Sequence, residues 1–361
     1  MSLLHNWLKA STTPKKKGHI VLGNQAADLD SMASSIAYAL LCALLQPREP
    51  TLPLMPIPRA DFFLRREAVY VFQQAGIELD YLVFWDEIDL ISLPEAIELV
   101  LVDHNILAPA LEQFRNRVGG ILDHHVDEGH YPAAEPRIIQ PVGSCASLVA
   151  LEFKKHGVIL EADIAILLAG TVLLDTGNLH QTTAADQAAA AYVLPFCPLH
   201  QDEYFQTIRQ EKYNVQGLST DDLLRKDYKE WCFGSIRCGI ASVRLSLEDW
   251  LVRDRTFTAG LTIFAEQRGL DLLFSMHSYT KLSFQRELII FCRTAIAIEP
   301  LLEFLQAKGL EFTSLVDGAV EQPVHGVIAC YRQHNPMISR KKLQPLLALF
   351  FANFSDNIFP A

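Results

Sequence analysis

Four short apolar runs in this chain each carry acidic or imidazole side chains at or near their carboxyl ends. They are HIVLGNQAADLDS (19–31), ELVLVDHN (98–105), GGILDHHVDEG (119–129) and ILLAGTVLLDTGNL (166–179). Such a run is typical of a buried parallel strand, and ligands of open α/β sheets bind just past the carboxyl ends of these strands. The pattern therefore predicts a single polar site along one sheet edge, formed by Asp28, Asp30, Asp103, His124, His125 and Asp175.

The first half of the chain alternates expected strands with expected helices. Strands are expected at about 19–23, 51–57, 81–84, 99–103, 120–123 and 137–140. Helices are expected after Asp30, Asp61, Ala108, Ser144, Ala162 and Thr183. This alternation predicts an α/β domain with a doubly wound parallel sheet, which we place at residues 1–197.

The composition changes after Pro195-Phe-Cys-Pro198. A polar helix is expected at about 200–216, and a last helix starts near Ser339. Further strands are expected at about 233–243, 270–277, 287–293, 311–316 and 322–331. Residues 198–361 are therefore predicted to form a smaller, mixed α/β domain.

Bulk composition narrows the range of partners. The 361 residues suffice for two domains, and 31 Lys plus Arg against 42 Asp plus Glu leave a net charge of −11, which disfavours general nucleic-acid binding. The most apolar segment, 164–174, is shorter than the roughly 20 residues that span a bilayer. No signal-peptide pattern is seen, and the seven cysteines lack CxxC spacing, so a reducing cytoplasm is expected. The oligomeric state stays open.

The acidic residues suit divalent metals, which prefer carboxylate and imidazole ligands for hydrolytic chemistry. Asp28 and Asp30 lie two residues apart after a strand, although each can also serve as a helix cap. Asp103 ends an apolar strand and is suited to bridging two metals; the alternative is an ordinary turn residue. Asp175 ends another apolar element before a flexible Thr-Gly.

The DHH sequence at 123–125 is the most specific of these signals. Two adjacent histidines in an irregular segment can serve different tasks, one as a metal ligand and one facing substrate. Asp123 can orient an imidazole from behind, as carboxylates often do for metal-bound histidines. We therefore expect His124 to bind metal and His125 to contact substrate.

Two basic segments in the second half complement the acidic site. In SRKKLQPLL, Ser339 is a possible helix N-cap followed by cations that the helix dipole disfavours unless an anion binds there. The alternative is an ordinary solvated basic face. The cations of the two segments are Arg340, Lys341 and Lys342, and Arg225, Lys226 and Lys229. Together with the metal residues they indicate a phosphoanhydride or phosphodiester hydrolase.

These motifs, in this order, resemble the DHH phosphoesterase superfamily. The resemblance covers roughly residues 18 to 350 and points to the branch with family II inorganic pyrophosphatases, exopolyphosphatases and prune-type enzymes. The SRKK segment resembles the DHH-associated C-terminal domain of that branch. The resemblance implies two lobes with the active site in the cleft between them, and a two-metal mechanism with a metal-bound water or hydroxide as nucleophile.

The resemblance also implies roles for individual residues. Asp28 and Asp103 would hold one metal, and Asp103 would bridge to a second metal held with it by Asp30, His124 and Asp175. His125 would contact phosphate near the metals, with Asp103, His125 and Asp123 as the catalytic group. Phosphoryl oxygens would be gripped from the opposite lobe by Lys229, Arg340 and Lys341.

One position departs from the pyrophosphatase pattern. Family II pyrophosphatases carry His in GHxxxDxD, where this chain has Asn24 in GNQAADLD. An amide oxygen is a harder and weaker ligand than imidazole, so Mg²⁺ should compete better with Mn²⁺ or Co²⁺. Asn at this position resembles the exopolyphosphatase and prune branches, and Asn24 is counted among the substrate-binding candidates. The segment LVDHN does not discriminate, because pyrophosphatases share it.

The sequence therefore predicts a cytoplasmic exopolyphosphatase that removes terminal orthophosphate from linear inorganic polyphosphate, using two divalent ions, with Mg²⁺ expected first. An inorganic pyrophosphatase is the nearest alternative. A nucleotide or cyclic-nucleotide phosphodiesterase would need an aromatic cleft for the base. A catalytically silent interaction protein would show eroded metal ligands, whereas only Asn24 departs here.

Overall fold

The computed structural model describes residues 2–11, 13–14, 16–293, 298–315 and 326–354. The chain divides into two compact units, Met1–Asn214 and Val215–Ala361. The first unit extends past residue 197 because α8 (Gln201–Tyr213) packs on it, with Tyr204 and Ile208 in its core. Within the described residues, no helix combines the length and apolar character that crossing a bilayer would need.

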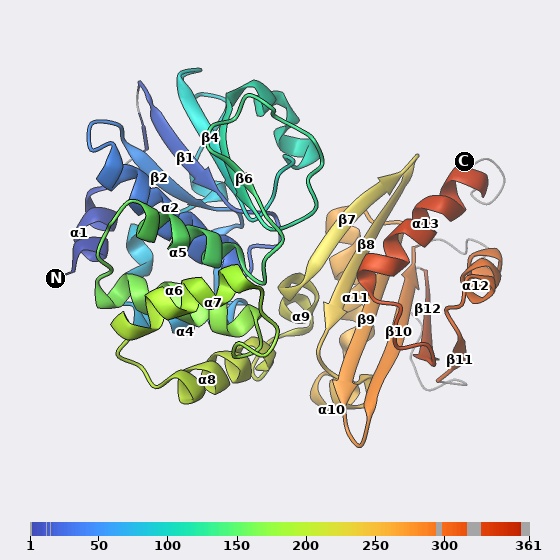
Figure 1. The fold of residues 1–361 in the computed structure, drawn as a ribbon. Coiled ribbons are helices and arrows are strands. Elements are labelled where there is room, and N and C mark those ends of the chain that lie inside the picture. The colour runs from blue at the N-terminus through green and yellow to red at the C-terminus, as the bar shows by residue number, and fades with distance from the viewer. Residues whose placement is uncertain (1, 12, 15, 294–297, 316–325, 355–361) are drawn as a thin grey trace. The chain divides into compact units, whose positions relative to one another are not determined.

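The first unit is built on a six-stranded sheet in the order β3-β2-β1-β4-β5-β6, and every neighbouring pair is parallel. This confirms the predicted doubly wound sheet (Figure 1). The strands are β1 (Gly18–Leu22), β2 (Thr51–Met55), β3 (Val83–Phe84), β4 (Ile97–Val102), β5 (Val118–Asp123) and β6 (Arg137–Ile139). The strand order reverses between β1 and β4, the position where such sheets bind ligands.

Apolar side chains cover both faces of this sheet. One core joins the sheet to the helices of the unit, and a smaller core lies under the 3-10 helix Pro109–Arg117. The helices of the unit are α1 (Leu3–Ala10), α2 (Leu29–Leu45), α3 (Arg59–Phe62), α4 (Arg66–Gln74), α5 (Cys145–Lys155), α6 (Ala162–Asp175), α7 (Ala184–Val193) and α8. Helix α2 follows β1 and is buried along most of its length, which fixes the loop between them.

Asp175 ends the helix that was expected after Ala162, so the interpretation of its apolar run as a strand is wrong. It is the last residue of helix α6, not the end of a strand. Residues 163–173 of this helix are all buried, so its sequence is apolar on every side and lacks helical periodicity. A short apolar run of this kind does not distinguish a buried strand from a buried helix, and its length of 14 residues is the feature that favours the helix.

The second unit contains a mixed six-stranded sheet in the order β11-β12-β10-β9-β8-β7, in which only the described pair β8–β9 is parallel. Its strands are β7 (Tyr228–Phe233), β8 (Ile236–Val243), β9 (Leu272–Thr280), β10 (Phe284–Cys292), β11 (Phe312–Ser314) and β12 (Val327–Gln333). The mixed α/β prediction is confirmed, although β7 was not expected as a strand. Residues 316 and 322–325 of two expected strands lie outside the described residues.

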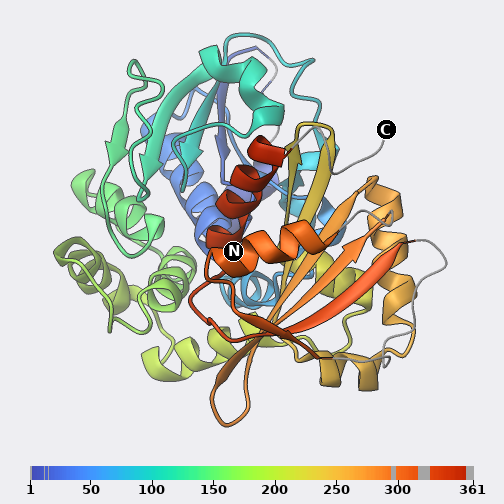
Figure 2. The same ribbon diagram turned by 90° about the vertical axis from the view of Figure 1, so that its right-hand side faces the viewer.

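Helices cover both faces of the second sheet as well. Helices α9 (Thr220–Lys226), α10 (Leu247–Arg253) and α11 (Phe257–Arg268) share one core with it. Helices α12 (Ile298–Ala307) and α13 (Arg340–Phe354) share the other, and Figure 2 shows them over one face of the strands. The second sheet is therefore buried on both sides, like the first.

Candidate metal centre

Acidic and imidazole side chains meet at the carboxyl ends of β1, β4 and β5. Asp103 directly follows β4, and His124 directly follows β5, which pairs with β4 in parallel. Ligand atoms of Asp103, His124 and His125 all lie within 4.8 Å of one another. The His124 Nε2 lies 3.1 Å from Asp103 Oδ1 and 3.9 Å from Asp30 Oδ2. Parallel strands that end at one edge thus bring residues from distant segments together.

Asp103 occupies the centre of the group. It is 2% exposed, and its φ of +61° is in the left-handed region that non-glycine residues rarely adopt. The Asn24 amide donates to Asp103 Oδ2 at 2.6 Å and to the Asp103 carbonyl at 3.1 Å. Backbone strain at a buried carboxylate is typical of functional positions.

Asn24 presents a donor to this centre. Its Oδ1 accepts a hydrogen bond from the Ala26 N–H at 2.8 Å, so its Nδ2 is the atom directed to Asp103. The Ala26 contact fixes the orientation of the amide, because the opposite assignment would place two donors together. In this arrangement Asn24 supports Asp103 instead of offering its amide oxygen to a cation.

Asp28 and Asp30 are held by different parts of the first unit. Asp28 caps α2, with Oδ1 accepting from the Ser31 N–H at 3.1 Å. Asp30 is buried against the first turn of α5, where it accepts hydrogen bonds from the Ser144 hydroxyl and the N–H groups of Cys145 and Ala146. The helix cap that the sequence allowed as an alternative is thus present at Asp28, and it leaves Oδ2 of that carboxylate without a hydrogen bond from any described group.

Hydrogen bonds at Nδ1 fix the orientation of both imidazoles, those of His124 and His125. The Nδ1 of His124 lies 2.9 Å from the Val142 carbonyl oxygen, which leaves Nε2 facing the acidic group. The Nδ1 of His125 lies 2.8 Å from Asp123 Oδ1, and Asn105 donates to the other oxygen of this fully buried carboxylate. This is the arrangement in which a protein sets the tautomer of a ligand or substrate-binding histidine.

Two supporting residues carried no signal in the sequence. Arg65 is 8% exposed and donates to the carbonyls of Ala26 and Ala27, at 3.1 and 3.2 Å, which holds the loop before Asp28. Asp186 accepts from the Gly143 N–H and the Ser147 hydroxyl, next to the α5 turn that holds Asp30. Both act over long sequence separations, so no local pattern marks them.

Burial and neighbouring negative charge set the electrostatics of the site. Burial and the neighbouring Asp30 raise the pKa of Asp103 to about 8. Burial raises the pKa of Asp30, and burial with the charge of Asp30 raises the pKa of Asp175 well above its usual value. Burial opposes the charged form of His124, but its hydrogen bond to Asp103 and the charge of Asp30 raise its pKa to about 10. These carboxylates oppose one another's ionisation, and a divalent cation would relieve that repulsion.

The basic candidates belong to the second unit. Arg340 donates to the Asp227 carbonyl at 2.7 Å and to its Oδ1 at 2.6 Å, so its guanidinium is engaged by a neighbour in the same unit. Arg225 is paired with Asp221 and Asp222. Lys229 on β7 and Lys341 in the first turn of α13 are exposed. Their contact with a substrate stays a prediction.

Known proteins share both halves of this chain. Residues 19–174 match the DHH family, N-terminal domain, and residues 206–350 match the DHHA2 domain. A Schizosaccharomyces pombe protein named "Putative exopolyphosphatase" is 36% identical over 96% of this chain and 94% of its own length. "Exopolyphosphatase PRUNE1" of Homo sapiens is 31% identical over 97% of this chain and 79% of its own length.

More distant relatives agree on the fold. A "Manganese-dependent inorganic pyrophosphatase" of Methanothrix thermoacetophila is 23% identical over 77% of this chain and 86% of its own length. The crystal structure of the "Methanococcus jannaschii putative family II inorganic pyrophosphatase" matches 92% of this chain and 99% of that one, with a TM-score of 0.57 and 21% identity. This chain therefore belongs to the DHH family, with a DHHA2 domain following the DHH domain.

Proposed function

We propose that the protein is an exopolyphosphatase that hydrolyses terminal orthophosphate from linear inorganic polyphosphate. The observation that carries the proposal is the group of Asp103, Asp30 and His124, in which both carboxylates are buried and Asp103 is held in a strained backbone conformation with a raised pKa. The names of the relatives at 36% and 31% identity support the same reaction. Phosphoanhydride hydrolysis needs positioning and charge stabilisation more than covalent chemistry, and this group is suited to both.

The donor set fits divalent ions. Carboxylates and a neutral imidazole Nε2 are ligands of Mg²⁺, Mn²⁺ and Co²⁺. The raised pKa values of Asp30 and Asp103 mean that their ionisation is opposed in the metal-free protein, and a bound divalent ion would favour the ionised form. Two ions would be held by Asp28, Asp30, Asp103, His124 and Asp175. When bound, they would supply charge stabilisation for the phosphoryl group and a more acidic water.

The other residues have roles that follow from their own contacts. With Nδ1 bound to Asp123, His125 can donate from Nε2 to a phosphoryl oxygen when protonated, and its bond to Asp123 raises its pKa, which favours that form. Asn24 keeps Asp103 in place through its amide. Lys229, Arg340 and Lys341 would bind phosphoryl oxygens, with the cationic Arg340 already ordered by Asp227. We propose the first domain as the metal domain and the second as the phosphate-binding domain.

An inorganic pyrophosphatase is the second candidate, favoured by the relatives named as manganese-dependent pyrophosphatases. Asn24 separates the two candidates. Replacing it with His should raise affinity for Mn²⁺ or Co²⁺ relative to Mg²⁺ if position 24 is next to a metal. An unchanged metal preference would place Asn24 outside the ligand shell.

The test compares orthophosphate release from long-chain polyphosphate, tripolyphosphate and pyrophosphate, each with Mg²⁺, Mn²⁺ or Co²⁺. Faster turnover of the polyphosphates supports the exopolyphosphatase. Dominant pyrophosphate hydrolysis would replace it with the pyrophosphatase. Release from none of the three would contradict both and direct attention to nucleotide esters. Exposed Asp80, changed to Asn, serves as a control for loss of a carboxylate outside the site.

A further inference from the structure

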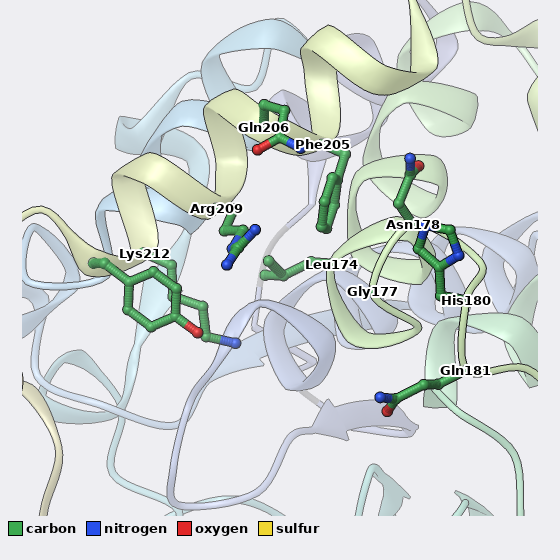
Figure 3. Close-up of a pocket in the computed structure, with 10 residues that line it drawn as sticks. Leu174, Gly177, Asn178, His180, Gln181, Phe205, Gln206, Arg209 and Lys212 are labelled. Atoms are coloured by element: carbon green, nitrogen blue, oxygen red, sulfur yellow. The ribbon is translucent and has the colours of Figure 1, made fainter. Parts of the chain in front are cut away.

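A cavity of about 450 Å³ lies within the first unit, and its lining includes residues on either side of Asp175 in the sequence. One wall is the loop that follows α6, and the other is one side of α8 (Figure 3). Its lining includes Leu174, Gly177, His180, Gln181, Arg209 and Lys212. None of the roles assigned above uses this cavity.

The lining is cationic in an acidic protein. Three basic side chains, His180, Arg209 and Lys212, line the cavity and no carboxylate does, although the chain has a net charge of −11. Arg209 forms no hydrogen bond or ion pair with any group that the structure describes, and the same is true of the side chains of His180 and Gln181. A guanidinium, an amide and an imidazole that line one cavity without partners of their own among the described residues are suited to a phosphoryl group, which accepts several hydrogen bonds.

The cavity adjoins the metal centre through Asp175. This residue follows Leu174 and precedes Gly177 by two positions, and both of these line the cavity. Lys212 is half-buried, and its charge acts on Asp175 and Asp28. Lys212 therefore lies toward the proposed metal ligands, while exposed Arg209, one helical turn earlier on α8, lies farther out.

The loop that forms the wall opposite α8 is held in place without a ligand. Gly177, Asn178 and Leu179 all adopt left-handed backbone conformations, with φ of +59°, +60° and +68°. The Asn178 amide donates to Asp202 at 2.7 Å and accepts from Gln201 at 3.0 Å, which ties this loop to the first turn of α8. Both walls thus keep their spacing without a ligand, which lowers the entropy cost of binding one.

We propose that this cavity is an anion subsite for a phosphoryl group of the polyphosphate chain at least two positions from the group being removed. The proposal rests on the exopolyphosphatase function. Arg209 and His180 would hold this distal group, and Lys212 would link it to the metal centre. Pyrophosphate is too short to occupy the subsite and the reacting position together, so the cavity would favour longer chains.

The test uses Arg209→Gln, with Arg209→Lys as the conservative variant. Arg209→Gln should lower the ratio of kcat/KM for long-chain polyphosphate to that for pyrophosphate by about tenfold, as expected for one charge-assisted hydrogen bond. The loss should appear as a higher KM for polyphosphate. Arg209→Lys should retain part of the wild-type ratio. Arg48→Gln is the matched control, because Arg48 is exposed and has no partner within the described residues. An equal loss for both substrates would overturn the proposal.

Binding separates this proposal from the activity. Calorimetry with Mg²⁺ present would measure the affinities of wild type and Arg209→Gln for a methylene-bridged tripolyphosphate analogue, for methylene diphosphonate and for orthophosphate. Arg209→Gln should weaken binding of the three-phosphorus analogue about tenfold and leave the affinities for methylene diphosphonate and orthophosphate nearly unchanged. If wild-type protein released no phosphate from polyphosphate, the proposed function would fail, yet the same binding difference would still support an anion site. Equal affinities in wild type and variant would reject the site, and an orthophosphate effect as large would make it a product site instead.

Discussion

The two units bury charged side chains against six-stranded sheets in opposite ways. In the second unit, the buried Glu287 accepts hydrogen bonds from Tyr279 at 2.6 Å, from Arg332 at 3.1 Å and from the Leu247 N–H at 2.7 Å. In the first, burial and the nearby carboxylate of Asp30 raise the pKa of Asp103 to about 8. A buried charge with a full set of partners stabilises structure, whereas charges left in mutual repulsion indicate a ligand site.

Two histidines show the same contrast. His124 in the first unit contacts carboxylates, which raise its pKa to about 10 against the opposing effect of burial. His277 in the second unit is fully buried between the Leu245 carbonyl and the Ser275 hydroxyl, and burial lowers its pKa to about 4. The His124 imidazole lies among charged groups, whereas the His277 imidazole is neutral and buried.

The largest expected effect is on Asp103. Asp103→Asn should lower phosphate release by about 10³-fold or more, because the central carboxylate is lost. The same change should leave the free energy of unfolding of the metal-free protein equal or higher, since it removes a buried carboxyl whose ionisation burial and Asp30 oppose. Enzyme assays and urea unfolding, with Asp80→Asn as control, would check both. A large loss of stability would show that Asp103 serves structure and not ligand binding.

Glu287 is expected to behave in the opposite way. Glu287→Ala should lower the free energy of unfolding by about 3 kcal/mol, because the buried Leu247 N–H would lose its acceptor and the partly exposed Arg332 its ion-pair partner. Glu287→Gln should cost less, since it keeps an acceptor. Urea unfolding of the full chain measures the difference. A loss below about 0.5 kcal/mol, the range of ordinary surface changes, would contradict the comparison.

The sequence was informative where a feature is local. Apolar runs encode strands, and parallel strands end at one edge, so the convergence of Asp103 with His124 followed from the pattern alone. It was less informative where tertiary contacts decide. Asn24 meets Asp103 across 79 positions, and Arg65 meets Ala27 across 38, so neither role has a local signal. Asp175 was ambiguous because a helix buried on all sides has no amphipathic period.

His277 in the second unit should cause a loss of folding stability at acidic pH. The pKa of His277 is about 4 in the folded protein and about 6.5 in an unfolded chain. The stability linked to neutral His277 is therefore present above about pH 6.5 and lost as the pH falls through 4, by up to about 3 kcal/mol. His277→Gln should flatten this pH dependence in thermal unfolding between pH 4 and about 6.5. An unchanged slope would count against the buried neutral imidazole.

Asp103 and His124 in the first unit should cause a loss of folding stability as the pH rises. The pKa of Asp103 is raised to about 8 and that of His124 to about 10, so the folded metal-free protein binds protons more tightly than the unfolded chain. Its stability should therefore fall as the pH rises from about 4 through 8 and on toward 10. Added Mg²⁺ or Mn²⁺ should reduce this fall by binding only the folded site. If added metal left this loss of stability unchanged, the loss would not come from Asp103 and His124.

The smallest expected effect tests how Asn24 contributes. Its amide donates to Asp103 and accepts from Ala26, so Asn24→Ala removes one hydrogen bond to a carboxylate and should lower activity about tenfold. Asn24→Asp is nearly the same size but places an acceptor and a charge against Asp103, and it should lower activity further. If Asn24 instead offered its oxygen to a metal, Asn24→Asp would be the milder change, because a carboxylate binds divalent ions better than an amide. The order of the two variants in one assay therefore decides between a supporting donor and a ligand.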